Sequence, residues 1–171
     1  MWVRWQSRVV YRTGHYGAAL LCYAPLGALL LVAGRPGLAV VGGAGVLALA
    51  RLPDHDLRVP LLSHRGPTHT LLFAAIVGLA VGGVGWLLGS GEAFGSAGGP
   101  VLAGLGVLVG TLAVVSHLLA DALTPAGVTP FWPFSSRNYS FGVATADNPI
   151  ANYGLLALGV FVSVLLAVAL R

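Results

Sequence analysis

Five long apolar segments constrain the fold of this chain more than any other feature of its sequence. A helix needs roughly 20 apolar residues, and at least about 17, to cross the hydrocarbon core of a bilayer. The apolar segments occupy residues 17–33, 36–50, 70–90, 101–120 and 150–170. The second of them is shorter than the others and rich in glycine. The sequence therefore predicts an all-α, polytopic membrane bundle of about five transmembrane helices, in a single domain over residues 1–171.

The composition agrees with a location in the membrane. Charged residues make up only 8% of the chain and hydrophobic residues 57%, whereas a soluble domain contains about 25% charged residues. The lipid bilayer is therefore the expected partner. The basic residues are nine arginines, and they lie beside the apolar segments. Membrane topology explains that distribution better than a nucleic acid does, so we expect no nucleic-acid partner.

The arginines also predict an orientation, because basic residues are enriched in cytoplasmic loops. A cytoplasmic N-terminus places seven of the nine arginines on that side and only Arg35 and Arg171 on the other. The same orientation puts the loop Gly91–Pro100 outside and every histidine and aspartate at the cytoplasmic face. We therefore expect a multi-pass protein of the cell membrane, with its N-terminus and its polar residues in the cytoplasm.

Histidines and aspartates gather at the ends of the apolar segments, where ionisable groups are costly to dehydrate and are usually retained for a function. Six of them form three close pairs, which are Asp54 and Asp56, His64 and His69, and His117 and Asp121. Taken singly, such a residue is more often an interface residue or a helix cap. Together, imidazole and carboxylate ligands suit zinc, manganese or iron, and no thiolate is placed for a cysteine-type zinc site. The sequence predicts one divalent-metal site, with zinc favoured.

The spacing within two of the pairs supports a shared site. His117 and Asp121 lie four residues apart on a predicted helix and therefore share one of its faces. Asp54 and Asp56 follow Pro53, and in an extended loop alternate side chains point the same way. The two carboxylates are therefore expected to converge.

A mechanism follows from these residue types. A bound divalent metal makes a coordinated water nucleophilic at neutral pH, and Asp54 or Asp56 could orient or deprotonate that water. Arg65 has the fork geometry that suits a phosphate oxygen, although anchoring to lipid headgroups is an equal alternative. Because the site is expected at the membrane surface, a lipid phosphate is the natural substrate class. The segment Thr124–Tyr139, rich in proline and aromatic residues, is expected to form an interfacial loop over the site.

Four motifs resemble those of a known family. His64–Thr70 (HRGPTHT) is similar to its HRGxTHS signature, and Ser116–Val128, with Trp132–Pro133 beyond, is similar to its second block. Leu52–Asp56 (LPDHD) resembles its LPDxD element, and Gly14–His15 resembles its N-terminal Gly-His pair. The chain thus resembles, from about residue 14 to 134, the YdjM-like family of predicted membrane-bound metal-dependent hydrolases.

The resemblance adds His15 to the expected metal ligands and implies a hydrolase. The family is regarded as distantly related to zinc-dependent phospholipase C, which implies cleavage of a phosphoester by analogy of fold. One position departs from the family pattern. Members often carry histidine directly after the second aspartate, where this chain has Leu57, while His55 occupies a position that is usually apolar. Either His55 replaces that ligand or the ligand is dispensable.

Two other functions remain open at this stage. A metal or proton transporter would use buried histidine and aspartate as a relay, although these residues cluster at one face and not at mid-span. A non-catalytic scaffold would use the metal to hold helix ends together. Such a structural site is four-coordinate and closed, whereas a hydrolase keeps an open coordination position.

Overall fold

Five helices dominate the computed structural model, which describes residues 12–58, 65–91 and 95–170. They are α1 (Arg12–Val32), α2 (Pro36–Leu49), α3 (Leu71–Gly89), α4 (Gly98–Ala122) and α5 (Pro149–Ala169). Two short 3₁₀ helices, η1 (Pro53–Arg58) and η2 (Pro67–His69), lie between α2 and α3. The described residues form no strand, apart from one isolated bridge between Val128 and Tyr139. The predicted all-α bundle is confirmed.

All five helical units are long and apolar enough to cross a membrane. The second reaches membrane length only as Pro36–Leu57, because α2 alone has 14 residues and η1 continues it. The largest differences from the predicted segments lie at three helix ends: α1 begins at Arg12, and α4 runs from Gly98 to Ala122. The polar residues at the start of α1 and the end of α4 lowered the hydropathy there, yet they continue the helical turns.

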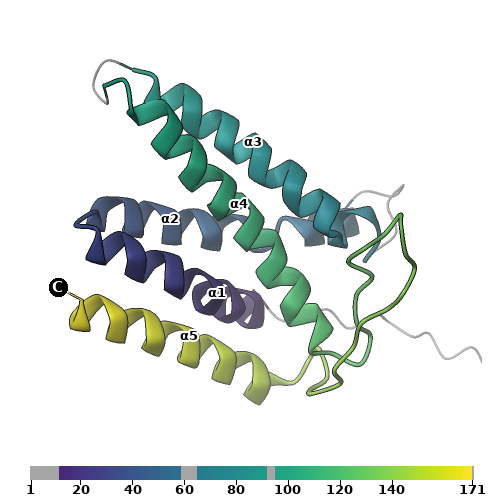
Figure 1. Ribbon diagram of the computed structural model, residues 1–171. Coiled ribbons are helices and arrows are strands. Elements are labelled where there is room, and N and C mark those ends of the chain that lie inside the picture. Colours follow the sequence, from purple (N-terminus) through teal and green to yellow (C-terminus); the bar gives the residue numbers. More distant parts are fainter. Residues whose placement is uncertain (1–11, 59–64, 92–94, 171) are drawn as a thin grey trace, which may run out of the picture.

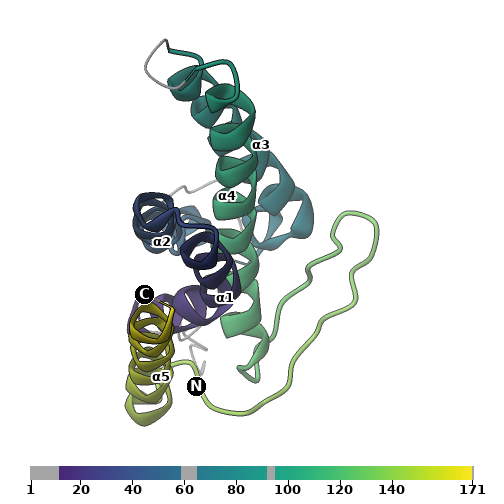
Figure 2. The ribbon, with the colours of Figure 1, turned by 60° about the vertical axis from the view of Figure 1, so that its left-hand side comes forward.

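The helices alternate in direction, so one end of the bundle collects the start of every odd helix and the end of every even one (Figure 1). We call this the site end. Helix α1 packs between α2 and α5, while α3 and α4 form a second pair that is tilted against the first group. The connection between α4 and α5, residues 123–148, extends away from the helices before it returns to α5 (Figure 2).

Glycines allow the α3–α4 pair to pack closely. A Cβ atom added at Gly106 would lie 2.5 Å from the carbonyl oxygen of Val81, and one added at Gly85 would meet the Leu102 carbonyl group. Membrane helices associate largely through van der Waals packing, which small residues improve by letting backbones approach. These glycines therefore fix how α4 lies on α3, and with it the position of the polar residues at the end of α4.

Substitution of Gly106 by alanine is expected to destabilise the protein by about 1–3 kcal/mol, because the added methyl group meets backbone that cannot move aside. Gly104 on the same helix is the matched control, since a Cβ there meets nothing within 4 Å. Gly104→Ala should leave the stability unchanged or raise it by up to about 1 kcal/mol, because alanine favours helix. Unfolding of both variants in detergent measures the difference, and equal stabilities would contradict close packing at Gly106.

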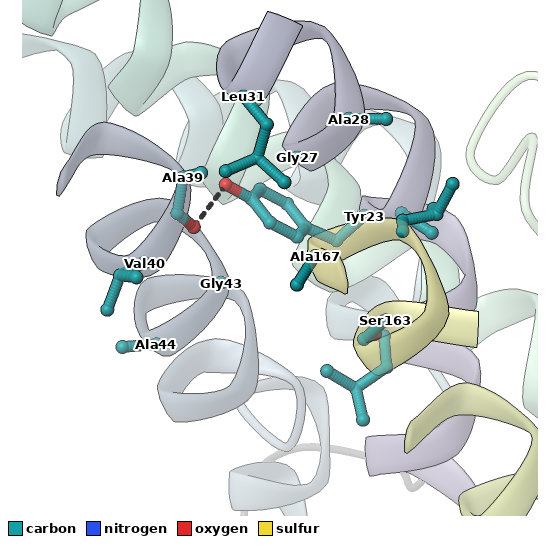
Figure 3. Close-up of a pocket in the computed structure, with 13 residues that line it drawn as sticks. Tyr23, Gly27, Ala28, Leu31, Ala39, Val40, Gly43, Ala44, Ser163 and Ala167 are labelled. Atoms are coloured by element: carbon teal, nitrogen blue, oxygen red, sulfur yellow. Dashed lines mark hydrogen bonds between the residues drawn. The ribbon is translucent and has the colours of Figure 1, made fainter. Parts of the chain in front are cut away.

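A cavity of about 260 Å³ lies between α1, α2 and α5 (Figure 3). Its lining residues lie toward the end of α1, the start of α2 and the end of α5, which is the end opposite the site end. Its walls are mainly small and aliphatic side chains. The Tyr23 hydroxyl donates a hydrogen bond of 2.7 Å to the carbonyl oxygen of Ala39 and so joins α1 to α2. None of the described histidines, aspartates or arginines lines this cavity. It belongs to the apolar packing of the bundle.

Candidate metal centre

Six of the seven predicted metal ligands meet at the site end, and they come from four segments of the chain. His15 lies in the first turn of α1, and His69 ends η2. The others lie in η1 and in the last turns of α4. The six side chains are 0–7% exposed: His15, Asp54, Asp56, His69, His117 and Asp121. The seventh, His64, lies outside the described residues.

Three donor atoms have the spacing of ligands on one ion. His69 Nε2 lies 3.2 Å from His117 Nε2, and Asp121 Oδ2 lies 3.4 and 3.6 Å from those two nitrogens. Ligands of a tetrahedral ion with bonds of about 2.0–2.1 Å are about 3.3 Å apart. Asp121 Oδ2 accepts no hydrogen bond from the described residues. The three side chains could therefore hold a divalent ion through one face of a tetrahedron.

The end of α2 fixes which nitrogen of His117 faces this cluster. His117 Nδ1 lies 2.8 Å from the carbonyl oxygen of Ala50. A carbonyl oxygen can only accept, so Nδ1 carries the proton and Nε2 presents its lone pair. A metal-binding histidine typically donates its other N–H to such an acceptor, which fixes the ring and raises its basicity.

Asp56 and Thr68 orient His69 in the same way. The Thr68 hydroxyl donates to Asp56 Oδ2 at 3.0 Å, and His69 Nδ1 lies 3.3 Å from the same carboxylate oxygen. Asp56 thus contacts the Nδ1 edge of the His69 ring, while the cluster lies on the Nε2 edge. The expectation of an extended loop was wrong, because Pro53–Arg58 is a 3₁₀ helix with about three residues per turn. Asp54 and Asp56 therefore reach opposite edges of one imidazole.

Arg65 connects this cluster to the α4–α5 connection. Its Nη2 donates to Asp121 Oδ1 at 3.0 Å, and its Nη1 donates to the Gly127 carbonyl oxygen at 2.6 Å. The backbone of Arg65 is left-handed, with φ of 60°, which costs a residue with a side chain about 1–2 kcal/mol. Its N–H donates to Asp56 Oδ2 at 3.3 Å, a contact that helps to hold this conformation. The guanidinium thus has protein partners, and its predicted role as a phosphate ligand stays a prediction.

Asp54 lies between this cluster and His15. Its Oδ1 is 3.5 Å from His117 Nε2 and 3.9 Å from His69 Nε2, and its Oδ2 is 3.8 Å from His15 Nε2. The ring of His15 stacks on that of His117, with 3.9 Å between centroids and 6° between planes. His15, Asp54 and His117 therefore form a second group with the spacing of metal ligands.

His55 joins neither group of donors. Its side chain is exposed, and its Nδ1 lies 3.2 Å from the carbonyl oxygens of Arg51 and Leu52. Leu57, at the position where the family often has histidine, is 52% exposed. The described cluster thus forms without a donor from either position. The sequence did not mark Thr68 or the Ala50 carbonyl as orienting groups, although Thr68 lies inside the HRGPTHT motif.

The fold and this cluster define a polytopic membrane protein whose buried histidine and aspartate side chains could hold a metal ion. A family model described as YdjM inner membrane protein matches residues 11–170. The chain belongs to this family, and the resemblance found in the sequence is confirmed. No curated protein and no solved structure matches the chain.

Proposed function

We propose that this protein is a membrane-bound, metal-dependent hydrolase that cleaves a phosphoester of a lipid-like substrate. The observation that carries the proposal is the three-atom face formed by His69, His117 and Asp121. Catalytic zinc sites have three protein ligands and an open position, whereas structural sites are closed by four. The cluster lies at the site end and not at mid-span, which favours a hydrolase over a transporter with a transmembrane relay.

Each side chain of the cluster has a distinct proposed role. His69, His117 and Asp121 would hold a divalent ion, with zinc favoured and manganese or iron as alternatives. Such an ion would lower the pKa of a coordinated water and polarise a phosphoryl oxygen. Asp54 Oδ1, which lies 3.5 Å from His117 Nε2, is placed to accept a hydrogen bond from the attacking water and to orient it. Arg65 carries the positive charge nearest to Asp121 and supports a phosphate on that side.

A pocket beside the cluster supports a lipid as the substrate class. This pocket has a volume of about 300 Å³ and lies between the end of α4 and the start of α5. Apolar side chains such as Leu123, Val143 and Leu155 form much of its wall. Thr124 also lines it, and its hydroxyl lies 3.4 Å from Arg65 Nη1. A substrate could therefore place an acyl chain between two membrane helices while its phosphate reaches the cluster.

The site is proposed to face the cytoplasm. Figure 1 shows the start of α1 and the connection between α4 and α5 at one end of the bundle, and the polar cluster belongs to this end because it includes residues of the first turn of α1 and the last turns of α4. A cytoplasmic N-terminus therefore brings the site to the cytoplasmic leaflet, in accord with the distribution of arginines. Lipids of that leaflet are the substrates to test first.

A hydrolysis panel with the purified protein in nanodiscs tests this function. We expect elemental analysis to find a divalent metal and the protein to cleave at least one phospholipid or phosphoester. Removal of the metal with a chelator should abolish the cleavage, and addition of Zn²⁺ or Mn²⁺ should restore it. Full metal content without cleavage across the panel would favour the scaffold. Metal uptake by proteoliposomes, without any hydrolysis, would favour the transporter.

A further inference from the structure

His15 is a buried polar side chain of the site end whose hydrogen-bonding groups are not satisfied by the described residues. It is fully buried, and neither of its ring nitrogens makes a hydrogen bond to any described residue. A buried polar group without a partner costs about 1–3 kcal/mol, so nearly all such groups in native proteins are satisfied by protein, water or an ion. Among the described residues, Asp54 offers an opposite charge at 3.8 Å, which is too long for a hydrogen bond.

An ion held by His69, His117 and Asp121 would leave His15 unsatisfied, because His15 belongs to the other donor group. Two donor groups of the site end share His117, but its Nδ1 is used by the Ala50 carbonyl oxygen, so only Nε2 can bind a metal. That atom lies 3.2 Å from His69 Nε2 and 3.6 Å from Asp121 Oδ2, on the face described above. His117 can therefore serve one ion only. If that ion is bound with His69 and Asp121, the other donor group retains His15 and Asp54 for a second one.

We propose that His15 Nε2 and Asp54 Oδ2 bind a second divalent cation. Two donors on one ion with bonds of about 2.0–2.1 Å can be at most about 4.2 Å apart, and these two are 3.8 Å apart. The two oxygens of Asp54 face different donors, since Oδ1 lies toward His117 and Oδ2 toward His15. The carboxylate thus lies between the two cation positions. Among the described residues, His15 and Asp54 are the two proposed donors, and such a position has room for water or phosphate oxygens.

This inference rests on the metal centre of the proposed function, and it adds a second ion beside the first. In two-metal hydrolases, paired ions stabilise both the attacking and the leaving oxygen of a phosphoryl group. His15 and Asp54 would in that case hold the cation that neutralises the phosphoryl oxygen left without a partner at the first ion. The substrate class remains a phosphoester.

Counting bound Mn²⁺ by equilibrium dialysis tests the second position directly. Wild-type protein should bind two ions per chain, and His15→Ala should bind one. His15→Gln, which keeps a polar side chain of similar length, should also bind one and guards against loss of fold. His55→Ala is the matched control, since this exposed histidine next to Asp54 belongs to neither donor group, and it should keep two.

Electron paramagnetic resonance of the Mn²⁺-loaded protein gives a second measurement. Two neighbouring ions broaden each other's signals, so wild-type protein should give a broad coupled spectrum and His15→Ala the six lines of an isolated ion. One bound ion in wild-type protein, or two in both His15 variants, would overturn the second position. So would loss of both ions in both variants, because that would show one indivisible centre.

Stoichiometry and hydrolysis together separate this inference from the proposed function. One bound ion with phosphoester cleavage would keep the hydrolase and remove the second position. Two bound ions without cleavage would keep the second position and remove the hydrolase.

Discussion

Replacement of His117 by alanine is expected to abolish metal binding and phosphoester hydrolysis together. His117 Nε2 lies within 3.2–3.6 Å of donor atoms from His69, Asp121 and Asp54. Loss of His117 therefore removes the residue that both donor groups share. Changes to residues that only orient a ligand lower metal affinity about 10–100-fold, and loss of the ligand itself should exceed that range. Elemental analysis and the hydrolysis panel measure both effects.

Asp121→Asn provides a nearly isosteric companion to that variant. The amide keeps the size of the side chain but loses its negative charge, so the bundle should fold while metal affinity and turnover fall. His55→Ala, one residue from Asp54 but exposed, should behave as wild type in both measurements. Full metal content in His117→Ala would contradict the proposed centre, provided that the variant elutes as a folded protein on gel filtration.

Replacement of Arg65 by alanine is expected to lower metal affinity about 10–100-fold and hydrolysis at least as much. Arg65 holds Asp121 Oδ1 at 3.0 Å, which directs the other oxygen of that carboxylate toward the two imidazoles. Arg65→Lys should restore only part of the affinity, because an ammonium keeps the charge but cannot bond Asp121 and the Gly127 carbonyl oxygen as the fork does.

The two roles considered for Arg65 give different results in the same experiment. If the guanidinium acts chiefly on the substrate phosphate, Arg65→Ala should keep full metal content and lose only hydrolysis. If it positions Asp121, metal affinity should fall as well. Unchanged metal content and unchanged hydrolysis would exclude both roles.

Much of the fold could be predicted because hydropathy alone reports it. Four apolar runs of membrane length and one shorter run predicted five helices, and their alternation placed His69, His117 and Asp121 at one end. Helix ends were harder to predict, since polar residues such as His15 interrupt the apolar pattern without ending the helix. The 3₁₀ helix that completes the α2 span was not predicted, because Pro53 after the apolar run indicated the end of a helix.

The site was predictable as a set of residues but not as a geometry. His69, His117 and Asp121 were expected as ligands, and the structure places their donor atoms at metal-ligand spacing. The difference in surroundings between Asp54 and Asp56 could not be foreseen, because it depends on the local 3₁₀ conformation of the chain. His55 shows the same limit, since only its exposed position separates it from the adjacent buried carboxylate.

The wide spacing of the ligands along the chain has a consequence for biosynthesis. The donors begin at His15 in α1 and end at Asp121 in the last turn of α4, so no nascent chain holds the complete set before α4 has emerged from the ribosome. Because metal binding to a site absent from the unfolded chain contributes directly to folding free energy, the ion would act late in assembly. It would favour chains in which the first four helices have already inserted in their correct alternating directions.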